Sequence, residues 1–176
     1  MTPPRSPLSP ATVAAQAGGA IDMASGGVVP PVHFATTFVR DEDYAPVNPA
    51  NTYLRSHNEN VRQAEAVLAR LEGAADCALF PSGMAAVAAV FRTVASGATV
   101  LVQRQIYWGT TKWLRDFCAR RDIALVEVEA SDNDAFAAAC AEHRPALCWI
   151  ETPSNPWLRI TDVAATAGAA HGVGGL

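Results

Sequence analysis

The 176 residues include 13 Lys and Arg against 17 Asp and Glu, which gives a net charge of −4, and 50% of them are hydrophobic. This composition favours one folded domain with a core and offers no basic surface for nucleic acid. The longest apolar stretches, such as 84–91, are far shorter than the roughly 20 residues that cross a bilayer, so we expect no membrane partner.

The first ten residues contain four prolines and no apolar block of the kind found in signal peptides. We therefore expect disorder over 1–10 and a cytoplasmic protein. Residues 26–50 contain Pro, Asp and Asn without helical spacing, which predicts an extended segment. We assign 1–59 to an N-terminal extended arm and 60–176 to an incomplete α/β domain.

Apolar residues between 61 and 71 recur at helical spacing, which predicts a helix with Asn60 as its N-cap and Gly73 as its end. After Gly73, short apolar runs typical of strands alternate with longer helical patterns. The predicted strands are 77–80, 99–103, 123–128 and 146–151, and the predicted helices are 83–94, 110–121, 134–144 and 162–171. This order predicts a mostly parallel α/β sheet.

The cysteines give no sign of a disulfide framework or a metal site. Their separations of 41, 22 and 8 positions form no CxxC pair, so we expect free and mostly buried thiols at Cys77, Cys118, Cys140 and Cys148. The four histidines form no HExxH string, and we expect no metal.

The segment Ser82, Gly83, Met84 follows a predicted strand and opens a predicted helix. Unpaired backbone N–H groups and the positive end of the helix dipole favour a phosphate there. An ordinary N-cap serine explains the same residues. Neither GxxxxGK[ST] nor GxGxxG occurs in the chain, which disfavours a nucleotide-binding domain.

Three further segments contain residues that could bind a ligand. Tyr53 and Arg55 alternate on the arm, so their side chains would point the same way and grip a phosphate, although an exposed surface pair is the alternative. Tyr107 follows a predicted strand and could present its ring at the carboxyl edge of the sheet, or pack at a helix start. Asn155, which follows another strand, would face the same edge unless 151–156 is a plain proline-bounded turn.

Taken in order, these segments resemble the Cys/Met metabolism family of pyridoxal-phosphate-dependent enzymes, which includes cystathionine γ-synthase, cystathionine lyases and methionine γ-lyase. The resemblance extends from about Gly26 to His171. It rests on Tyr53-Leu-Arg55, Asn58, 65–73, Ser82-Gly-Met-Ala-Ala86, Tyr107-Trp-Gly-Thr110 and Glu151-Thr-Pro-Ser-Asn-Pro156. It implies the aspartate-aminotransferase-like fold, fold type I, with the chain supplying the arm and part of the large domain.

The resemblance also implies roles for these residues. Ser82, Gly83 and Met84 would bind the phosphate of pyridoxal 5'-phosphate. Tyr107 would stack on the pyridine ring as a catalytic residue, and Asn155 would lie near the ring hydroxyl. The implied reaction is β- or γ-elimination or replacement on a sulfur-containing amino-acid substrate, as in transsulfuration.

Tyr53 and Arg55 match arm residues that reach into the site of a neighbouring subunit, so the resemblance implies a homo-oligomer, commonly a tetramer. The chain stops at Leu176, before the family's Schiff-base lysine, its aspartate partner of the pyridine nitrogen and its substrate-binding arginine. Lys112 does not replace that lysine by motif. We therefore expect an N-terminal fragment that is inactive by itself.

Other interpretations of the sequence stay open at this point. The chain could be a non-catalytic remnant that binds phosphate compounds or associates with a full-length relative. The exact substrate and the choice between lyase and synthase are not determined by these residues. Trp108 stands where the family frequently has glycine, which could reshape the substrate side of the pocket.

Overall fold

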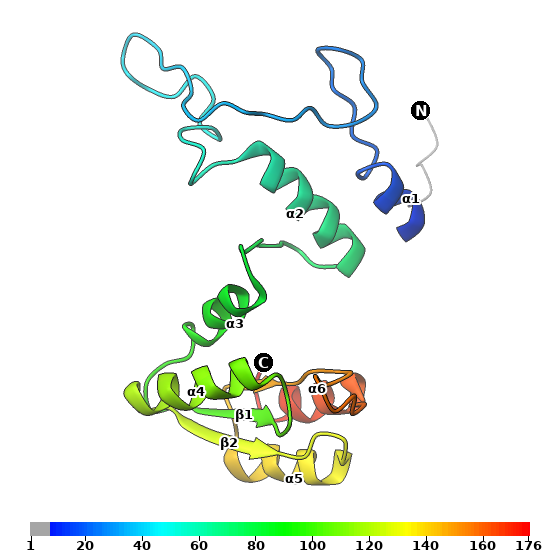
Figure 1. Cartoon of the computed structure of the whole chain (residues 1–176), viewed down its shortest axis with the longest axis vertical. Helices are drawn as coiled ribbons and strands as arrows, with labels where there is room; N and C mark the ends of the chain where they lie inside the picture. Colours follow the sequence, from blue (N-terminus) through cyan, green and yellow to red (C-terminus); the bar gives the residue numbers. More distant parts are fainter. Residues whose placement is uncertain (1–7) are drawn as a thin grey trace. The chain divides into compact units, whose positions relative to one another are not determined.

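The computed structural model describes residues 8–176, so the predicted disorder of 1–7 lies outside the described residues. The chain forms two compact units, Met1–Leu79 and Phe80–Leu176 (Figure 1). The predicted division after residue 59 differs from this boundary, because the helix that follows residue 59 belongs to the first unit. Ser9 and Pro10 begin helix α1 (Pro10–Ala15), so the predicted disorder does not extend to them.

The main helix of the first unit is α2 (Glu59–Glu72). Its N-cap is Asn58, whose side chain accepts the Asn60 N–H at 3.0 Å, so the predicted N-cap at Asn60 is wrong by two positions. Asn60 instead binds the arm, since its amide accepts the His33 N–H at 3.0 Å and donates to the His33 carbonyl at 3.1 Å. Gly73 ends the helix in the left-handed conformation with φ 64°, as predicted.

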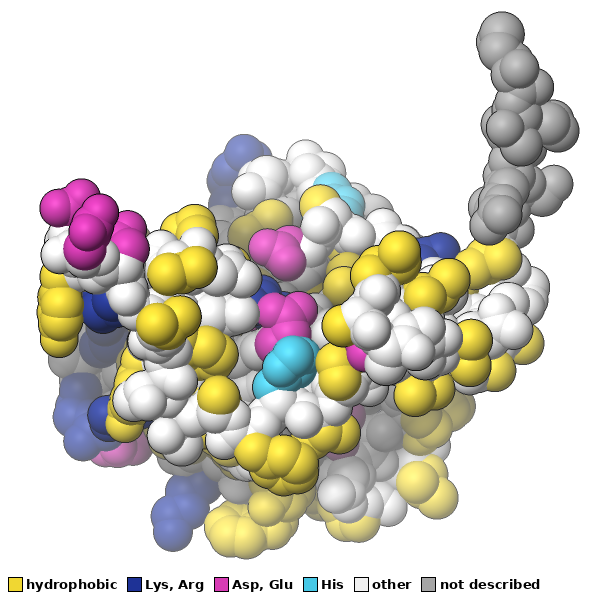
Figure 2. Space-filling view, turned by 90° about the horizontal axis from the view of Figure 1, so that it is seen from above, with side chains coloured by type: hydrophobic (Ala, Val, Ile, Leu, Met, Phe, Trp, Pro, Cys, Tyr) yellow, Lys and Arg dark blue, Asp and Glu magenta, His cyan; other side chains and the backbone are white. Residues whose placement is uncertain are grey.

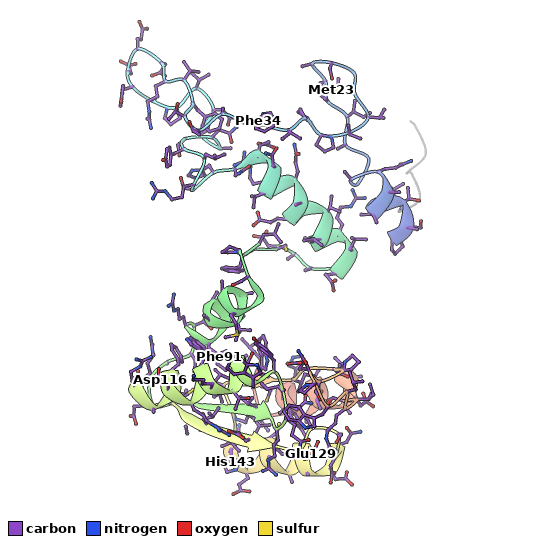
Figure 3. All side chains as sticks on the ribbon, viewed as in Figure 1. Met23, Phe34, Phe91, Asp116, Glu129 and His143 are labelled. Carbon is purple, nitrogen blue, oxygen red and sulfur yellow. The ribbon has the colours of Figure 1, made fainter. Side chains whose placement is uncertain are left out.

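The segment 26–50 contains no helix, as predicted, but it is not simply extended, because turns and isolated bridges such as Arg40 with Pro46 hold it. Among its described residues only Val13 is buried. Met23 and Phe34 are 87% and 86% exposed, and both are labelled in Figure 3. Hydrophobic side chains are spread over the face shown in Figure 2. The first unit therefore has almost no core of its own.

The second unit contains a parallel three-stranded sheet in the order β2-β1-β3, which confirms the predicted α/β class. β1 has the predicted bounds, and the ends of the unit's other helices and strands lie within three residues of the predicted ones. The helices and strands are α3 (Gly83–Phe91), β1 (Thr99–Gln103), α4 (Trp108–Arg120), β2 (Ala124–Val128), α5 (Asn133–His143), β3 (Leu147–Trp149) and α6 (Val163–Gly172). The predicted strand 77–80 does not form, because no strand in the described residues pairs with this segment.

The sheet has a core on each of its faces. Val100 and Val102 of β1 pack with α3 and α4, whereas Leu101 between them packs with Phe136 of α5. Figure 1 shows α4 and α5 on opposite sides of the strands. The side chains of these three residues are at most 2% exposed, as expected for a central parallel strand. This packed core supports the loops at the strand ends.

The free side of β3 is partly covered by the last residue of the sequence. The Leu176 N–H donates to the Ala146 carbonyl at 3.1 Å, and the Leu176 carbonyl accepts the Cys148 N–H at 2.7 Å. These two bonds form the pattern of a parallel strand pair. None of the helices in 8–176 has the length and apolar character needed to span a membrane.

Candidate functional site

A cavity of about 480 Å³ lies at the carboxyl ends of β1 and β3 in the second unit. The first turns of α3 and α4 form two of its walls, and the end of β3 forms a third. Its lining residues are Ser82, Gly83, Met84, Val87, Tyr107, Thr110, Trp149, Ile150 and Glu151. The structure thus brings together the predicted phosphate turn, Tyr107 and the start of the segment 151–156.

The start of α3 has the geometry of an anion site. The Ser82 side chain accepts the Ala85 N–H at 3.1 Å, so Ser82 is an N-cap as well as a cavity residue. The first N–H groups of a helix have no intrahelical partner, and those of Gly83 and Met84 are at this end. A Cβ on Gly83 would meet no atom within 4 Å. An anion therefore has open access to the positive end of the helix dipole.

Tyr107 is half-buried directly before α4, and its position depends on two neighbours. Its backbone N–H donates to Glu151 Oε2 at 3.1 Å. Its ring lies against the backbone of Gly109, where an added Cβ would come within 2.5 Å of the ring atom Cε1. Glycine at 109 therefore allows the ring to lie back against the helix start on one side of the cavity.

Glu151 connects the parts of the site, a role that sequence reasoning did not assign to it. Besides the bond from Tyr107, its Oε1 accepts the Asn155 N–H at 2.6 Å. Its own N–H donates to Gln103 Oε1 at 2.9 Å. The Asn155 side chain is exposed and does not line the cavity, so only the backbone of Asn155 is tied to the site.

Gln103 is a second residue that sequence reasoning missed. It is 1% exposed at the end of β1, and its Oε1 also accepts the Thr161 hydroxyl at 3.4 Å. Its Nε2 has no hydrogen-bond partner among the described residues. A glutamine in the last position of an apolar strand is the signal from which such a role could have been inferred.

Tyr53 and Arg55 belong to the first unit, and their predicted extended geometry is wrong. Tyr53 pairs with Thr37, and Arg55 lies in a turn in which the Ser56 and His57 N–H groups donate to the Tyr53 carbonyl at 3.1 and 2.9 Å. Tyr53 and Arg55 are therefore close together because of this turn, and not because they alternate along an extended strand. The Arg55 guanidinium lies 5.3 Å from the centre of the Tyr53 ring.

The thiols and the lysine supply no nucleophile to this cavity. All four cysteines are free, as predicted. Burial raises the pKa of Cys118 and Cys140, and it raises that of Cys148 to about 12. Lys112, the one lysine of the sequence, lines a different cavity.

Comparisons with known proteins agree with the motifs. The family model described as Cys/Met metabolism PLP-dependent enzyme matches residues 11–176. Cystathionine gamma-synthase of Mycobacterium tuberculosis is 35% identical over 159 residues, which are 90% of this chain and 40% of that protein. Cystathionine gamma-lyase of Rattus norvegicus is 32% identical over 148 residues, which are 84% of this chain and 36% of that protein.

Solved structures share the fold at similar identity. Cystathionine gamma synthase from Xanthomonas oryzae pv. oryzae has a TM-score of 0.87 and 34% identity, covering 97% of this chain and 44% of that one. A cystathione gamma lyase from Micromonospora echinospora has a TM-score of 0.85 and 34% identity, covering 96% and 43%. The chain spans about 40% of the length of the curated relatives that it matches. It belongs to the Cys/Met metabolism family of PLP-dependent enzymes.

Proposed function

We propose that the chain is the N-terminal part of a pyridoxal-phosphate-dependent enzyme of transsulfuration. The proposed reaction is β- or γ-elimination or replacement on a sulfur-containing amino acid of the cystathionine type. Family membership and the names of the relatives support this class of reaction. The location in the cytoplasm stays a prediction from the sequence.

One observation carries the proposal: the open N-terminus of α3 and the ring of Tyr107 line the same cavity. A helix start binds a phosphate, and an aromatic ring covers a flat heterocycle. The volume of about 480 Å³ falls in the usual range for small-molecule sites. The residues present therefore fit a ring that carries a phosphate.

Each of these residues has a proposed task. The Gly83 and Met84 N–H groups and the Ser82 hydroxyl bind the phosphate, and Tyr107 lies against the ring. Glu151 is a positioning residue, because it fixes the backbone of Tyr107. When bound, pyridoxal phosphate supplies the electron sink for carbanions formed on the substrate.

Tyr53 and Arg55 are proposed to act on the phosphate of a neighbouring subunit in a homo-oligomer, with a tetramer as the family's usual state. The poorly buried first unit supports association, because Met23 and Phe34 are almost fully exposed. A second copy of the chain would cover this apolar surface.

We further propose that the 176 residues bind the cofactor without catalysing a reaction by themselves. Lys112 is the one side-chain amine, and it does not line the cavity. A non-catalytic remnant with the same phosphate site remains the second candidate.

The phosphate role is tested with two substitutions of one residue. Gly83→Asp places a negative charge at the helix start, where it stabilises the helix but repels a phosphate. Gly83→Asn has nearly the same shape without the charge, and neither side chain meets a neighbour at Cβ. By equilibrium dialysis we expect Gly83→Asp to weaken pyridoxal phosphate binding about tenfold, and Gly83→Asn to weaken it by less than about threefold.

Pyridoxal, which lacks the phosphate, serves as the control ligand. It should bind the unmodified chain at least about tenfold more weakly than pyridoxal phosphate, and Gly83→Asp should not change its affinity further. Equal affinity for the two ligands, or equal losses for both substitutions, would refute the phosphate site at α3.

A further inference from the structure

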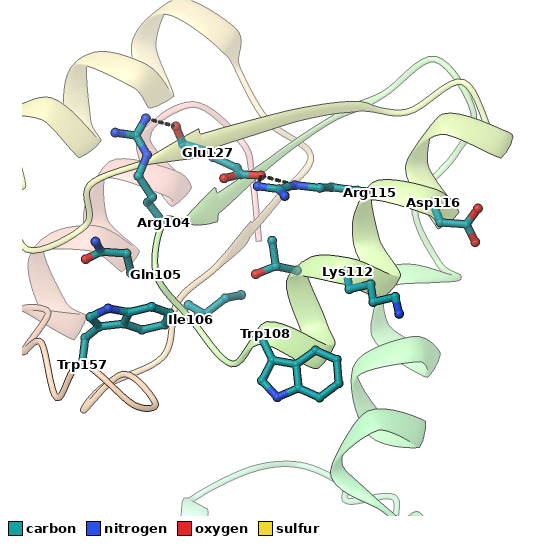
Figure 4. A pocket seen from close by; sticks show the side chains of 10 residues that line it. Arg104, Gln105, Ile106, Trp108, Lys112, Arg115, Asp116, Glu127 and Trp157 are labelled. Atoms are coloured by element: carbon teal, nitrogen blue, oxygen red, sulfur yellow. Dashed lines mark hydrogen bonds and ion pairs between the residues drawn. The ribbon is translucent and has the colours of Figure 1, made fainter.

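The second unit has another cavity, of about 630 Å³, which the proposed function does not use. Its walls are the segment 104–108 after β1, the first turns of α4, and Trp157 from the loop before α6 (Figure 4). Tyr107 faces the first cavity, whereas its neighbours Ile106 and Trp108 line this one. The two cavities are thus distinct, although one short segment contributes to both.

Two exposed indoles give this cavity an aromatic surface. Trp108 is 63% exposed and Trp157 is 49% exposed, while Ile106 is almost fully buried. Figure 4 shows the Ile106 side chain between the two indole rings in this view. A large aromatic side chain that stays exposed contributes little hydrophobic stabilisation to the fold. Two such side chains at one cavity favour binding of a flat apolar ligand.

The charged residues of the cavity leave a positive excess. Arg115 pairs with Glu127 at 2.7 Å, and Asp116 pairs with an arginine one turn further along α4. Arg104 donates to the Glu127 backbone carbonyl at 3.2 Å. Among the described residues, no carboxylate forms an ion pair with Arg104 or Lys112. Figure 4 shows these two cations on opposite sides of the cavity, and Lys112, one turn after Trp108 on α4, favours an anionic group on the ligand.

Gln105 lines the cavity with a side-chain oxygen that needs a hydrogen-bond donor. Its Oε1 is buried and has no hydrogen-bond partner among the described residues. Its backbone has φ 61°, the left-handed conformation that is uncommon for residues other than glycine. Figure 4 shows its amide beside Trp157. A buried acceptor without a donor is rare in folded proteins, and a donor on the ligand would satisfy it.

We propose that this cavity binds a planar aromatic acid that carries a hydrogen-bond donor on its ring. The ring lies against Trp108 and Trp157, and the acid group pairs with Lys112. The ring donor bonds to Gln105 Oε1. Binding at this cavity does not depend on pyridoxal phosphate.

The test uses 4-hydroxybenzoate as the probe and the four indole N–H signals in the ¹⁵N NMR spectrum of the 176-residue chain, assigned by single Trp→Phe variants. We expect the signals of Trp108 and Trp157 to shift on titration. Those of Trp113, which packs against the core, and of Trp149, which lines the first cavity, should stay in place. A shift of Trp149 alone, or no saturable shift, would overturn the proposal.

Two simpler ligands separate the contributions. Benzoate lacks the ring donor, and phenol lacks the acid group. By the same titration we expect each to bind about fivefold more weakly than 4-hydroxybenzoate. Equal affinities for all three would show that neither Gln105 nor Lys112 takes part, and would refute the proposal.

Lys112→Met removes one cation from an exposed position, so the variant should fold. It should weaken 4-hydroxybenzoate about fivefold and leave phenol unchanged. Arg92→Met, which removes an exposed cation that lines neither cavity, is the matched control and should change both affinities by less than about twofold. If both variants lost the same affinity for 4-hydroxybenzoate, the loss would reflect general charge attraction and would refute pairing with Lys112 at this cavity.

Discussion

Glu151 shows how one side chain organises the candidate site. Its two carboxylate oxygens accept N–H groups from Tyr107, 44 positions earlier, and from Asn155, four positions later. Such long-range bonds have no local sequence signature. The motif around residues 151–156 could therefore be recognised from the sequence, but the partners of Glu151 could not.

Glu151→Gln tests this role. An amide has one acceptor oxygen, so one of the two N–H groups would face an NH₂ donor and lose its bond. We expect the free energy of unfolding to fall by about 1 to 2 kcal/mol in urea denaturation, with weaker pyridoxal phosphate binding. Unchanged stability together with unchanged binding would contradict a positioning role.

The other site residues were predictable to different degrees. Ser82, Gly83 and Tyr107 were predicted from their places after expected strands, and the structure brings them to one cavity although the strand expected before Ser82 does not form. The side chain of Asn155 lies outside that cavity lining, because only its backbone is held by Glu151. Its place beside the ring hydroxyl stays a prediction.

At the scale of elements, α1 was not predicted, but the other helices were predicted well because their caps are local. The error at α2 arose because both Asn58 and Asn60 can serve as an N-cap. The bonds of Asn60 to the His33 backbone decide between them, and they join residues 27 positions apart. The strand predicted at 77–80 failed for a related reason, since an apolar run becomes a strand only beside a partner.

Two glycines inside helices give a matched pair of substitutions. Gly168 lies in α6, where an added Cβ meets nothing within 4 Å, so Gly168→Ala should raise the free energy of unfolding by about 0.5 to 1 kcal/mol. Gly109 lies in α4, and its Cβ would come within 2.5 Å of the Tyr107 ring. Gly109→Ala should therefore give no such gain and should weaken cofactor binding. If both variants gained the same free energy of unfolding in urea denaturation, the Tyr107 ring would not be held against Gly109.

At the scale of the molecule, the alternation of strands and helices correctly predicted a parallel sheet. The boundary between the units was not predictable from the same pattern. The apolar spacing of α2 predicts a helix but does not say which surface it packs against. In the structure α2 lies in the first unit with α1 and the arm.

The contrast between the units predicts different local stabilities. Backbone amides of α2 should exchange with deuterium at least about a hundredfold faster than those of the buried strand β1, because local opening of a poorly packed element has a low free energy. If a second copy covers the first unit, protection of α2 should rise with protein concentration. Slow exchange of α2 in dilute monomeric chain would contradict the absence of a core.

The two hydrogen bonds of Leu176 also set a register. Since its N–H and carbonyl bond to Ala146 and Cys148, Leu176 lies level with Leu147. Any strand that extends this pairing, whichever chain supplies it, runs in the direction of β3. At its carboxyl end β3 leads to Trp149, Ile150 and Glu151, which line the cavity that Tyr107 and Ser82 also line. A strand paired with β3 in this register would therefore run along its free edge toward that cavity.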